Sequence, residues 1–388
     1  MTTQNYAPLD EALEMLRPYG PELQNGNSNH APMAAEAMCV LGRGDAVIEW
    51  VDRYRHDLQP ARTSHSIIRE SEWRDVLGES DRVADWQAFF ANELAEHPSP
   101  EVLDCWVARL APGIIAAAAH GAIRTAHAAR SLAASQNEAH LRELAAGLAY
   151  WAAKYQTLPG TLDSNSESAT PAGESEFTQR PSRSPTASHL ARRSMISPNM
   201  RPARAIEALE LLPVARRGVL KSLTGALPEL DTFDPFRGVI SMIEVPHDPA
   251  AVLSELTNGF AEVLLANATT PLLTIAFVHC LTALYAVRNL TPHLSNETTR
   301  SAVKYGWQAA AALYTVLGTK AHSIAENITP AIERDDLIDR AIRSGDEHAI
   351  KYTEACLSEY VMSPSPIYLR AADRAIDLLT PTANSVRG

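Results

Sequence analysis

The chain has few cysteines, and their spacing excludes two common kinds of site. Four cysteines are scattered through the 388 residues, without a CxxC pair. Cysteine-rich zinc sites and disulfide frameworks both need short, regular spacings. We therefore expect small core side chains of a cytoplasmic protein, in which thiols stay reduced. These residues are Cys39, Cys105, Cys280 and Cys356.

Common enzyme fingerprints are missing as well. The sequence contains no HExxH zinc motif, no P-loop and no GxSxG motif. A GxG occurs from Gly42 to Gly44, but it lacks the βαβ context of a dinucleotide-binding site. Any catalytic site has to be assembled from residues far apart in the sequence.

Positive charge and long apolar runs are also scarce. Lys and Arg number 34 against 46 Asp and Glu, a net charge of -12, which would repel a nucleic acid backbone. The first 16 residues lack the basic patch and apolar core of a signal peptide. Residues 263–287 are uncharged, but Asn267 and Pro271 interrupt them and the remaining apolar part is shorter than the ~20 residues that a bilayer requires. We expect no nucleic acid or membrane partner, and a buried core helix here.

Ala and Leu recur at helical period almost everywhere, whereas strand signals are rare. This periodicity predicts amphipathic helices joined by Gly-, Pro- and Asn-rich segments. The sequence therefore predicts an all-α protein, and it carries no prediction of an oligomeric state. The clearest helical segments are residues 10–16, 30–42, 44–58, 85–97, 250–268, 301–318 and 367–379.

One segment interrupts the helical pattern. Residues 158–202 are dominated by Ser, Thr, Pro and Gly, with too few large apolar residues to offset the entropy of ordering. We expect a flexible linker or surface insertion here. The helices of 1–157 and 203–388 are then expected to pack as one bundle-like domain, since bundle helices pair across long connections.

Two histidines in the first half are candidate ligands. His30 precedes a helix, where the positive end of the helix dipole favours neutral imidazole, the form that binds metals; a loop His that caps the helix or meets water is the simpler interpretation. His120 lies in an uncharged stretch, 110–123, that predicts a helix buried all round. A buried imidazole needs partners for both nitrogens, which metal ligation or core hydrogen bonds can supply. His127, seven residues on, lies on the same helical face and is a reserve candidate.

The second half adds three candidates. His279 is a lone imidazole in the apolar helix LLTIAFVHCLTALYAV. His348 and Lys351 lie three residues apart in SGDEHAIKYTEACLSEY, and so on one ridge of a helix. Periodicity places this ridge opposite the apolar stripe, which favours a solvated face; a functional role requires that the ridge line an internal cavity. Glu347 and Glu354 are either surface charges or acceptors behind the site.

Taken in order, these pieces resemble the questin oxidase-like family. The matching segments are NHAPMAAEAM around His30, HGAIRTAHAAR from His120, FVHCLTALYAVR around His279, and DEHAIKYTEACLSEY with His348 and Lys351. The likeness spans nearly the whole chain apart from the Ser/Pro-rich segment. The motifs HGxIRTxHA and DEHxIKxTEA are specific when they occur together.

The resemblance implies an all-helical oxygenase that opens a ring of a polycyclic aromatic polyketide such as an anthraquinone, with O2 as oxidant. It implies Fe(II) held by His30, His120, His279 and His348, with Lys351 as a carboxylated fifth ligand. Imidazole and carboxylate-type oxygen suit iron among the first-row metals.

The chain departs from the family at two positions near the implied site. Fungal members tend to have histidines where this chain has Met33 and Arg124. Arg124 is a candidate for holding a phenolate or carboxylate of the substrate, and a surface salt bridge is the alternative. Trp307 and Tyr352 are candidates for lining the substrate pocket.

Two other interpretations stay open. One is an NADPH-linked Baeyer–Villiger-type monooxygenase without iron, in which the same residues bind substrate or an organic cofactor. The other is a non-catalytic helical ligand-binding protein, whose histidines are core or surface groups. Metal content separates the iron-dependent oxygenase from these two interpretations. The distances between the four histidines test the non-catalytic interpretation.

Overall fold

The structure is a computed structural model and describes residues 5–162, 197–212, 224–318 and 332–380. Helices dominate it, and the strands form one small sheet, so the all-α prediction is confirmed. The helices are α1 (Ala7–Leu16), α2 (Ala31–Val40), α3 (Val47–Tyr54), α4 (Val83–Glu96), α5 (Ser99–Leu110), α6 (His120–Ala134), α7 (Glu138–Ala153), α9 (Pro202–Glu210), α10 (Ala250–Asn267), α11 (Pro271–Leu290), α12 (Asn296–Leu317), α13 (Arg334–Ser344), α14 (Glu347–Met362) and α15 (Pro366–Leu379).

The small sheet lies beside the N-terminal helices. Strands β1 (Tyr19–Leu23) and β2 (Leu58–Pro60) pair antiparallel, with Leu23 opposite Leu58. The loop after β1 leads directly into α2, so the sheet anchors the segment that ends at His30.

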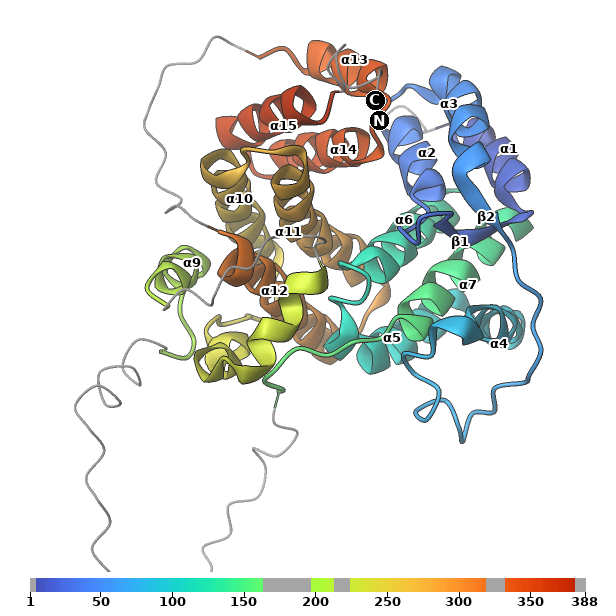
Figure 1. Ribbon diagram of the computed structural model, residues 1–388, viewed down its shortest axis with the longest axis horizontal. Coiled ribbons are helices and arrows are strands. Elements are labelled where there is room, and N and C mark those ends of the chain that lie inside the picture. Colours follow the sequence, from blue (N-terminus) through green and yellow to red (C-terminus); the bar gives the residue numbers. More distant parts are fainter. Residues whose placement is uncertain (1–4, 163–196, 213–223, 319–331, 381–388) are drawn as a thin grey trace, which may run out of the picture.

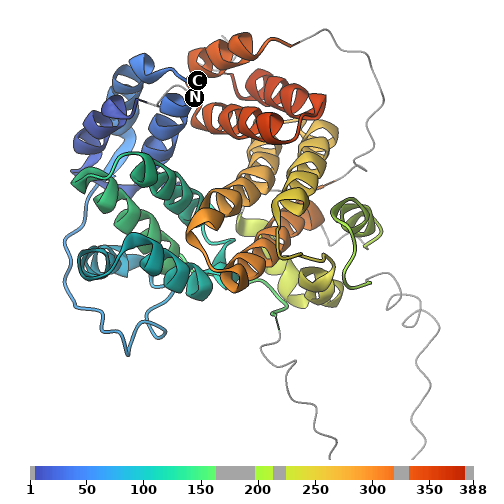
Figure 2. The same ribbon diagram turned by 180° about the vertical axis from the view of Figure 1, so that it is seen from behind.

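A four-helix ring occupies the centre of the molecule. Helix α2 packs on α6, α6 on α11, α11 on α14, and α14 back on α2. The two views of Figures 1 and 2 show these four helices around the middle of the fold, with the remaining helices outside them. Helices far apart in the sequence thus come to surround one point.

The residues before and after the predicted insertion share one hydrophobic core. One buried cluster contains side chains from both sides of it, including Trp106, Trp151 and Trp307. A second cluster joins helices α1, α2 and α3 and takes in Ile350 of α14. Most of the predicted insertion, residues 163–196, lies outside the described residues, and the division of the chain at 157 and 203 stays a prediction.

Helix α11 is the core helix that its composition indicates. The stretch Pro271–His293 is long and apolar enough to cross a membrane, yet 72% of its most apolar window is buried inside the fold. It packs against α6, α10, α12 and α14. Burial by neighbouring helices therefore accounts for its apolar character.

Candidate metal centre

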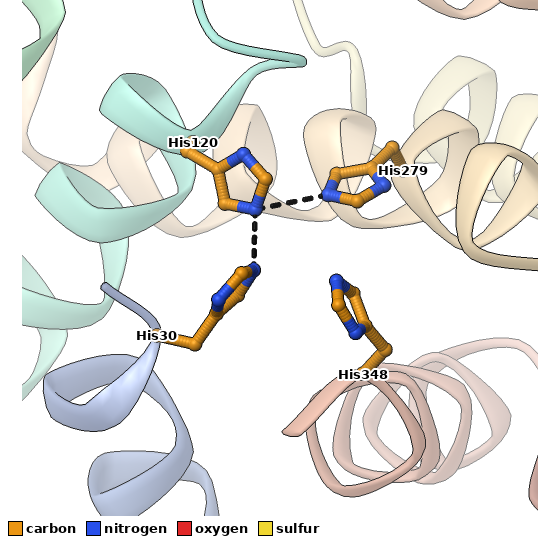
Figure 3. A group of neighbouring side chains, drawn as sticks. All are labelled: His30, His120, His279 and His348. Carbon is orange, nitrogen blue, oxygen red and sulfur yellow. Dashed lines mark hydrogen bonds between the residues drawn. The ribbon is translucent and has the colours of Figure 1, made fainter. Parts of the chain in front are cut away.

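Four histidines from the four helices of the ring meet in the interior. The Nε2 atom of His120 lies 2.6 Å from Nε2 of His30 and 3.1 Å from Nε2 of His279. The His348 ring lies 4.6 Å from the His30 ring and 5.4 Å from the His279 ring, centroid to centroid. One nitrogen from each residue falls within 4.8 Å of all the others, and the four rings face one another (Figure 3).

His30 is fixed by the turn that precedes α2. It occupies the N-cap position of that helix and is 3% exposed. The side chain of Asn29 bonds both sides of this junction, donating to the carbonyl of Gly20 and accepting from the backbone N–H of Ala31. The Tyr54 hydroxyl lies 3.3 Å from Nδ1 of His30. His30 thus lies at a helix start, but its side chain makes no capping hydrogen bond and is buried, so the interpretation as a capping or water-exposed residue is wrong.

His120 follows an unusual turn, which corrects the predicted continuous helix over 110–123. Ala117, Ala118 and Ala119 have φ values of 47°, 56° and 69°, and α6 begins only at His120. Left-handed backbone costs an alanine about 1–2 kcal/mol, and such strain tends to be kept at functional sites. The turn brings the carbonyl of Ala117 to Nδ1 of His120, as a hydrogen-bond acceptor.

His279 needs no special backbone. It lies in the middle of α11, is 1% exposed, and its Nδ1 lies 2.6 Å from the carbonyl oxygen of Ile275, one turn earlier. With its Nδ1–H donated to that carbonyl, the imidazole presents Nε2 to the centre.

His348 and Lys351 lie on the first turns of α14 and face the interior. They are 7% and 3% exposed, so the solvated face that periodicity favours is wrong. Helix α14 packs on α2 and α11 as well as on α13 and α15, so neighbours cover its polar ridge too. The Asp346 side chain caps α14 by accepting from the N–H groups of His348 and Ala349, both at 2.9 Å.

Two carboxylates border the His348 side of the centre. Oδ1 of Asp346 and Oε1 of Glu347 each lie 3.7 Å from Nδ1 of His348, and Glu347 also lies 3.6 Å from Nδ1 of His30. Nδ1 of His348 is buried without a hydrogen-bond partner in the described part of the chain. Small rotations of these side chains would let a carboxylate orient the imidazole, as acceptors behind metal ligands do.

Burial keeps three of the imidazoles neutral. Burial, followed by the nearby charge of Lys351, holds the pKa of His30 and of His120 well below its usual range. The pKa of His279 is also well below its usual range, because of burial and the adjacent His120 and His348. Neutral imidazole is the form that ligates a metal.

Lys351 is an unusual lysine. Burial lowers the pKa of its amine from 10.5 to about 7, although Glu347 and Asp346 act in the opposite direction. It lies one turn from His348 and is close enough for its charge to lower the pKa of His30, His120 and His279. A large fraction of a lysine with this pKa is a neutral, nucleophilic amine at neutral pH.

The arrangement of hydrogens fits a bound cation. His120 and His279 donate Nδ1–H to backbone carbonyls, so both Nε2 atoms carry lone pairs, and these atoms lie only 3.1 Å apart. Two lone pairs at this distance repel unless a positive ion lies between them. Nitrogens that bind one ion at ~2.1 Å lie ~3 Å apart when adjacent. The donor set could therefore hold a metal ion.

The other candidate residues lie outside the histidine cluster. Arg124 is buried and forms a two-bond pair with Glu143, at 2.6 and 2.8 Å. Nδ1 of His127 lies 2.7 Å from Oε2 of Glu36. Their catalytic roles stay predictions. Trp307 and Tyr352 are fully buried, and the indole of Trp307 donates to the carbonyl of Val239 at 2.8 Å, as in a packed core.

The sequence reasoning missed Glu36 and Arg130, two polar residues next to this centre. Glu36 of α2 is 1% exposed and bonds His127 and Arg130 of α6. The signal was available in the sequence, because Glu36 is the single charged residue of the apolar helix APMAAEAMCV. A lone carboxylate in a buried helix needs a buried cationic or hydrogen-bonding partner.

Comparisons with known proteins agree with the resemblance seen in the sequence. The search of curated proteins finds no match to this chain. The family model described as questin oxidase-like matches residues 27–356, a span that contains all four histidines and Lys351. The chain belongs to the questin oxidase-like family.

Proposed function

We propose that this protein is a non-haem iron oxygenase that cleaves a C–C bond in a ring of a polycyclic aromatic polyketide such as an anthraquinone. Membership of the family supports an oxidoreductase that acts on a small polyketide-type molecule. The observation that carries the proposal is the convergence of four buried histidine nitrogens within 4.8 Å, beside a buried lysine. Bound ferrous iron would supply the one-electron chemistry that lets O2 react with an aromatic ring.

Four histidines would supply the neutral ligands of such an ion. His30, His120, His279 and His348 would be the neutral ligands, with Nδ1 of His120 and of His279 fixed by backbone carbonyls. Because these hydrogen bonds set the tautomers, the Nε2 lone pairs are ready before an ion arrives. Burial excludes bulk water and strengthens every electrostatic interaction at the centre.

Lys351 would supply the anionic ligand. Its neutral amine can add CO2 and lose one proton to solvent, which gives a carbamate anion, an oxygen ligand on a long arm. Electrostatics favours an anion here, because α2, α6 and α14 all begin at the centre, at His30, His120 and Glu347. Each helix start carries about +0.5 of an elementary charge, which opposes a bare cation and stabilises a nearby negative group.

Metal analysis tests the proposal. Protein purified without a histidine tag is expected to hold about one iron per chain and to consume O2 in the presence of a hydroxylated anthraquinone. His279→Ala is expected to lose the iron and the activity, because His279 supplies one of the four nitrogens. His140→Ala is the matched control: His140 is fully buried as well, but it lies beside Asp10 and outside the cluster.

The outcome also separates the two other interpretations. Turnover by metal-free protein that depends on NADPH would overturn the iron proposal in favour of the Baeyer–Villiger-type oxidase. Iron-loaded protein that turns over no hydroxylated anthraquinone would overturn the substrate class and leave a metal-binding protein.

A further inference from the structure

A second layer of polar side chains accompanies the four histidines. Each helix that carries a histidine of the centre also carries a member of this layer, six to ten residues further along the chain. At 1.5 Å per residue, this separation is ~9–15 Å along a helix axis. We call these residues the Arg130 layer: Glu36 on α2, His127 and Arg130 on α6, Tyr285 on α11 and Glu354 on α14.

One guanidinium joins the layer. Nε of Arg130 donates to Oε1 of Glu36 at 2.9 Å, and Nη1 donates to Oε1 of Glu354 at 2.8 Å. The same Nη1 donates to the Tyr285 hydroxyl at 2.6 Å, and Tyr285 in turn donates to Glu354 at 2.8 Å. From α6, Arg130 thus bonds a residue on each of the other three helices of the ring.

The layer places two carboxyl groups around one guanidinium in the interior. Glu36 and Glu354 are each 1% exposed, and they face a single guanidinium. Burial acts to raise the pKa of Glu36, but Arg130 and the hydrogen bond with His127 lower it to about 2, so Glu36 is ionised at neutral pH. Oε2 of Glu354 is buried without a hydrogen-bond partner among the described residues.

Stability alone does not explain such a network. Buried ion pairs seldom stabilise a fold more than well-packed apolar side chains do, and their best-attested use is to specify one arrangement. The arrangement that Arg130 specifies is the relative position of the four helices that bring the histidines together. A shift of any one helix would move its histidine away from the other three.

We propose that Arg130 is a positioning residue of the metal centre, which holds the four helices of the ring in one register and thereby sets the affinity of the histidine cluster for a divalent ion. This inference rests on the proposed metal centre and adds to it a group of residues that never touches the ion. Loss of the guanidinium is expected to weaken metal binding even where the fold survives.

Arg340 provides a matched control. It also joins two helices through paired carboxylates, bonding Asp373 at 2.5 Å and Asp377 at 2.7 Å from α13 to α15. Its side chain is 26% exposed, against 19% for Arg130. Neither α13 nor α15 carries a histidine of the centre, so the loss of Arg340 should lower stability without changing the centre.

The experiment is a titration of metal-free protein with Co²⁺, followed by the visible ligand-field absorption of the bound ion. Arg130→Met is expected to raise the Kd about 10- to 100-fold, the range seen when groups behind metal ligands are removed. The absorption bands should also shift, because the ligands are no longer held in one geometry. Arg340→Met is expected to lower the melting temperature and leave the Kd and the bands unchanged.

Milder variants keep the test decisive if Arg130→Met does not fold. Tyr285→Phe removes one hydroxyl that Arg130 bonds, and Glu354→Gln removes one charge with almost no change of shape. Each is expected to raise the Kd several-fold with a band shift. Variants that bind Co²⁺ as tightly as the wild type, with the same bands, would overturn the role of Arg130. A wild type that binds no Co²⁺ would instead overturn the metal centre itself.

Discussion

The charge state of Lys351 depends on the residues that pack around it. Its position in the sequence, on the polar side of an amphipathic helix, favours a solvated cation. In the structure it is 3% exposed, and burial lowers the pKa of its amine to about 7. The difference arises because sequence periodicity describes one helix, whereas burial depends on which neighbours pack against each of its faces.

This lowered pKa predicts a pH dependence of stability. Between pH 7 and pH 10 the unfolded chain, with a pKa of 10.5, binds a proton at Lys351 that the folded chain does not. Stability rises with pH wherever the unfolded state binds more protons. We expect the free energy of unfolding of metal-free, CO2-free protein to gain up to about 1.4 kcal/mol per pH unit from this residue.

Denaturant titrations of the wild type and of Lys351→Met across this range measure the gain. The variant has no amine to titrate at this position. The free energy of unfolding of the wild type should therefore rise relative to that of the variant between pH 7 and pH 10. A constant difference between the two proteins from pH 7 to pH 10 would show that the amine is not buried in the folded chain.

The turn before α6 is the element that the sequence predicts least well. Four consecutive alanines, 116–119, indicate helix, because alanine is the strongest helix former. The structure places three of them in left-handed backbone, which brings the Ala117 carbonyl to His120. No local signal marks such a turn, since a glycine would normally occupy these positions. The helices with clear periodicity and caps were predictable, and this one strained turn was not.

Glycine substitutions test the strain in that turn. Ala118 has a φ of 56°, so Ala118→Gly is expected to relieve strain and to raise the free energy of unfolding by about 0.5–1 kcal/mol. The neighbouring Ala116 is not among the residues with positive φ, and Ala116→Gly should lower the free energy by about the same amount. Thermal and urea unfolding of the two variants give the comparison. Equal destabilisation by both would exclude left-handed backbone at Ala118.

At the scale of the whole molecule, a bound ion would stabilise the packing of the four ring helices against one another. The four helices meet at the histidines and at the Arg130 layer, and an ion pair between Arg288 and Glu359 also joins α11 to α14. An ion present at 100 times its Kd stabilises the folded state by about 2.7 kcal/mol. We therefore expect a chelator to lower the melting temperature by about 3 °C, because an unfolding entropy of about 2.1 cal/mol/K per residue gives about 1.2 °C per kcal/mol for 388 residues.

The His279→Ala variant is the control for that measurement. With one nitrogen missing it binds the ion weakly, so the chelator should leave its melting temperature nearly unchanged. An equal shift in the wild type and the variant would mean that the chelator acts somewhere other than the four histidines.

The sequence alone indicated the fold class and, through family resemblance, the histidines and Lys351. It could not indicate the order in which the helices surround the centre, because packing between distant helices leaves no periodic signal. The partners of the histidines were hidden for the same reason. Ala117 and Ile275 accept hydrogen bonds from the histidines through their backbone carbonyls. Every residue has such a carbonyl, so the identity of these two residues does not indicate that they are partners.

The spread of the four histidines along the chain also constrains the order of events during folding. His348 and Lys351 follow the other three histidines in the sequence, and α14 has to dock between α2 and α11 before the ring can close. A chain that has folded only as far as α11 offers three of the four nitrogens. An ion would therefore gain its full set of ligands only after α14 has docked.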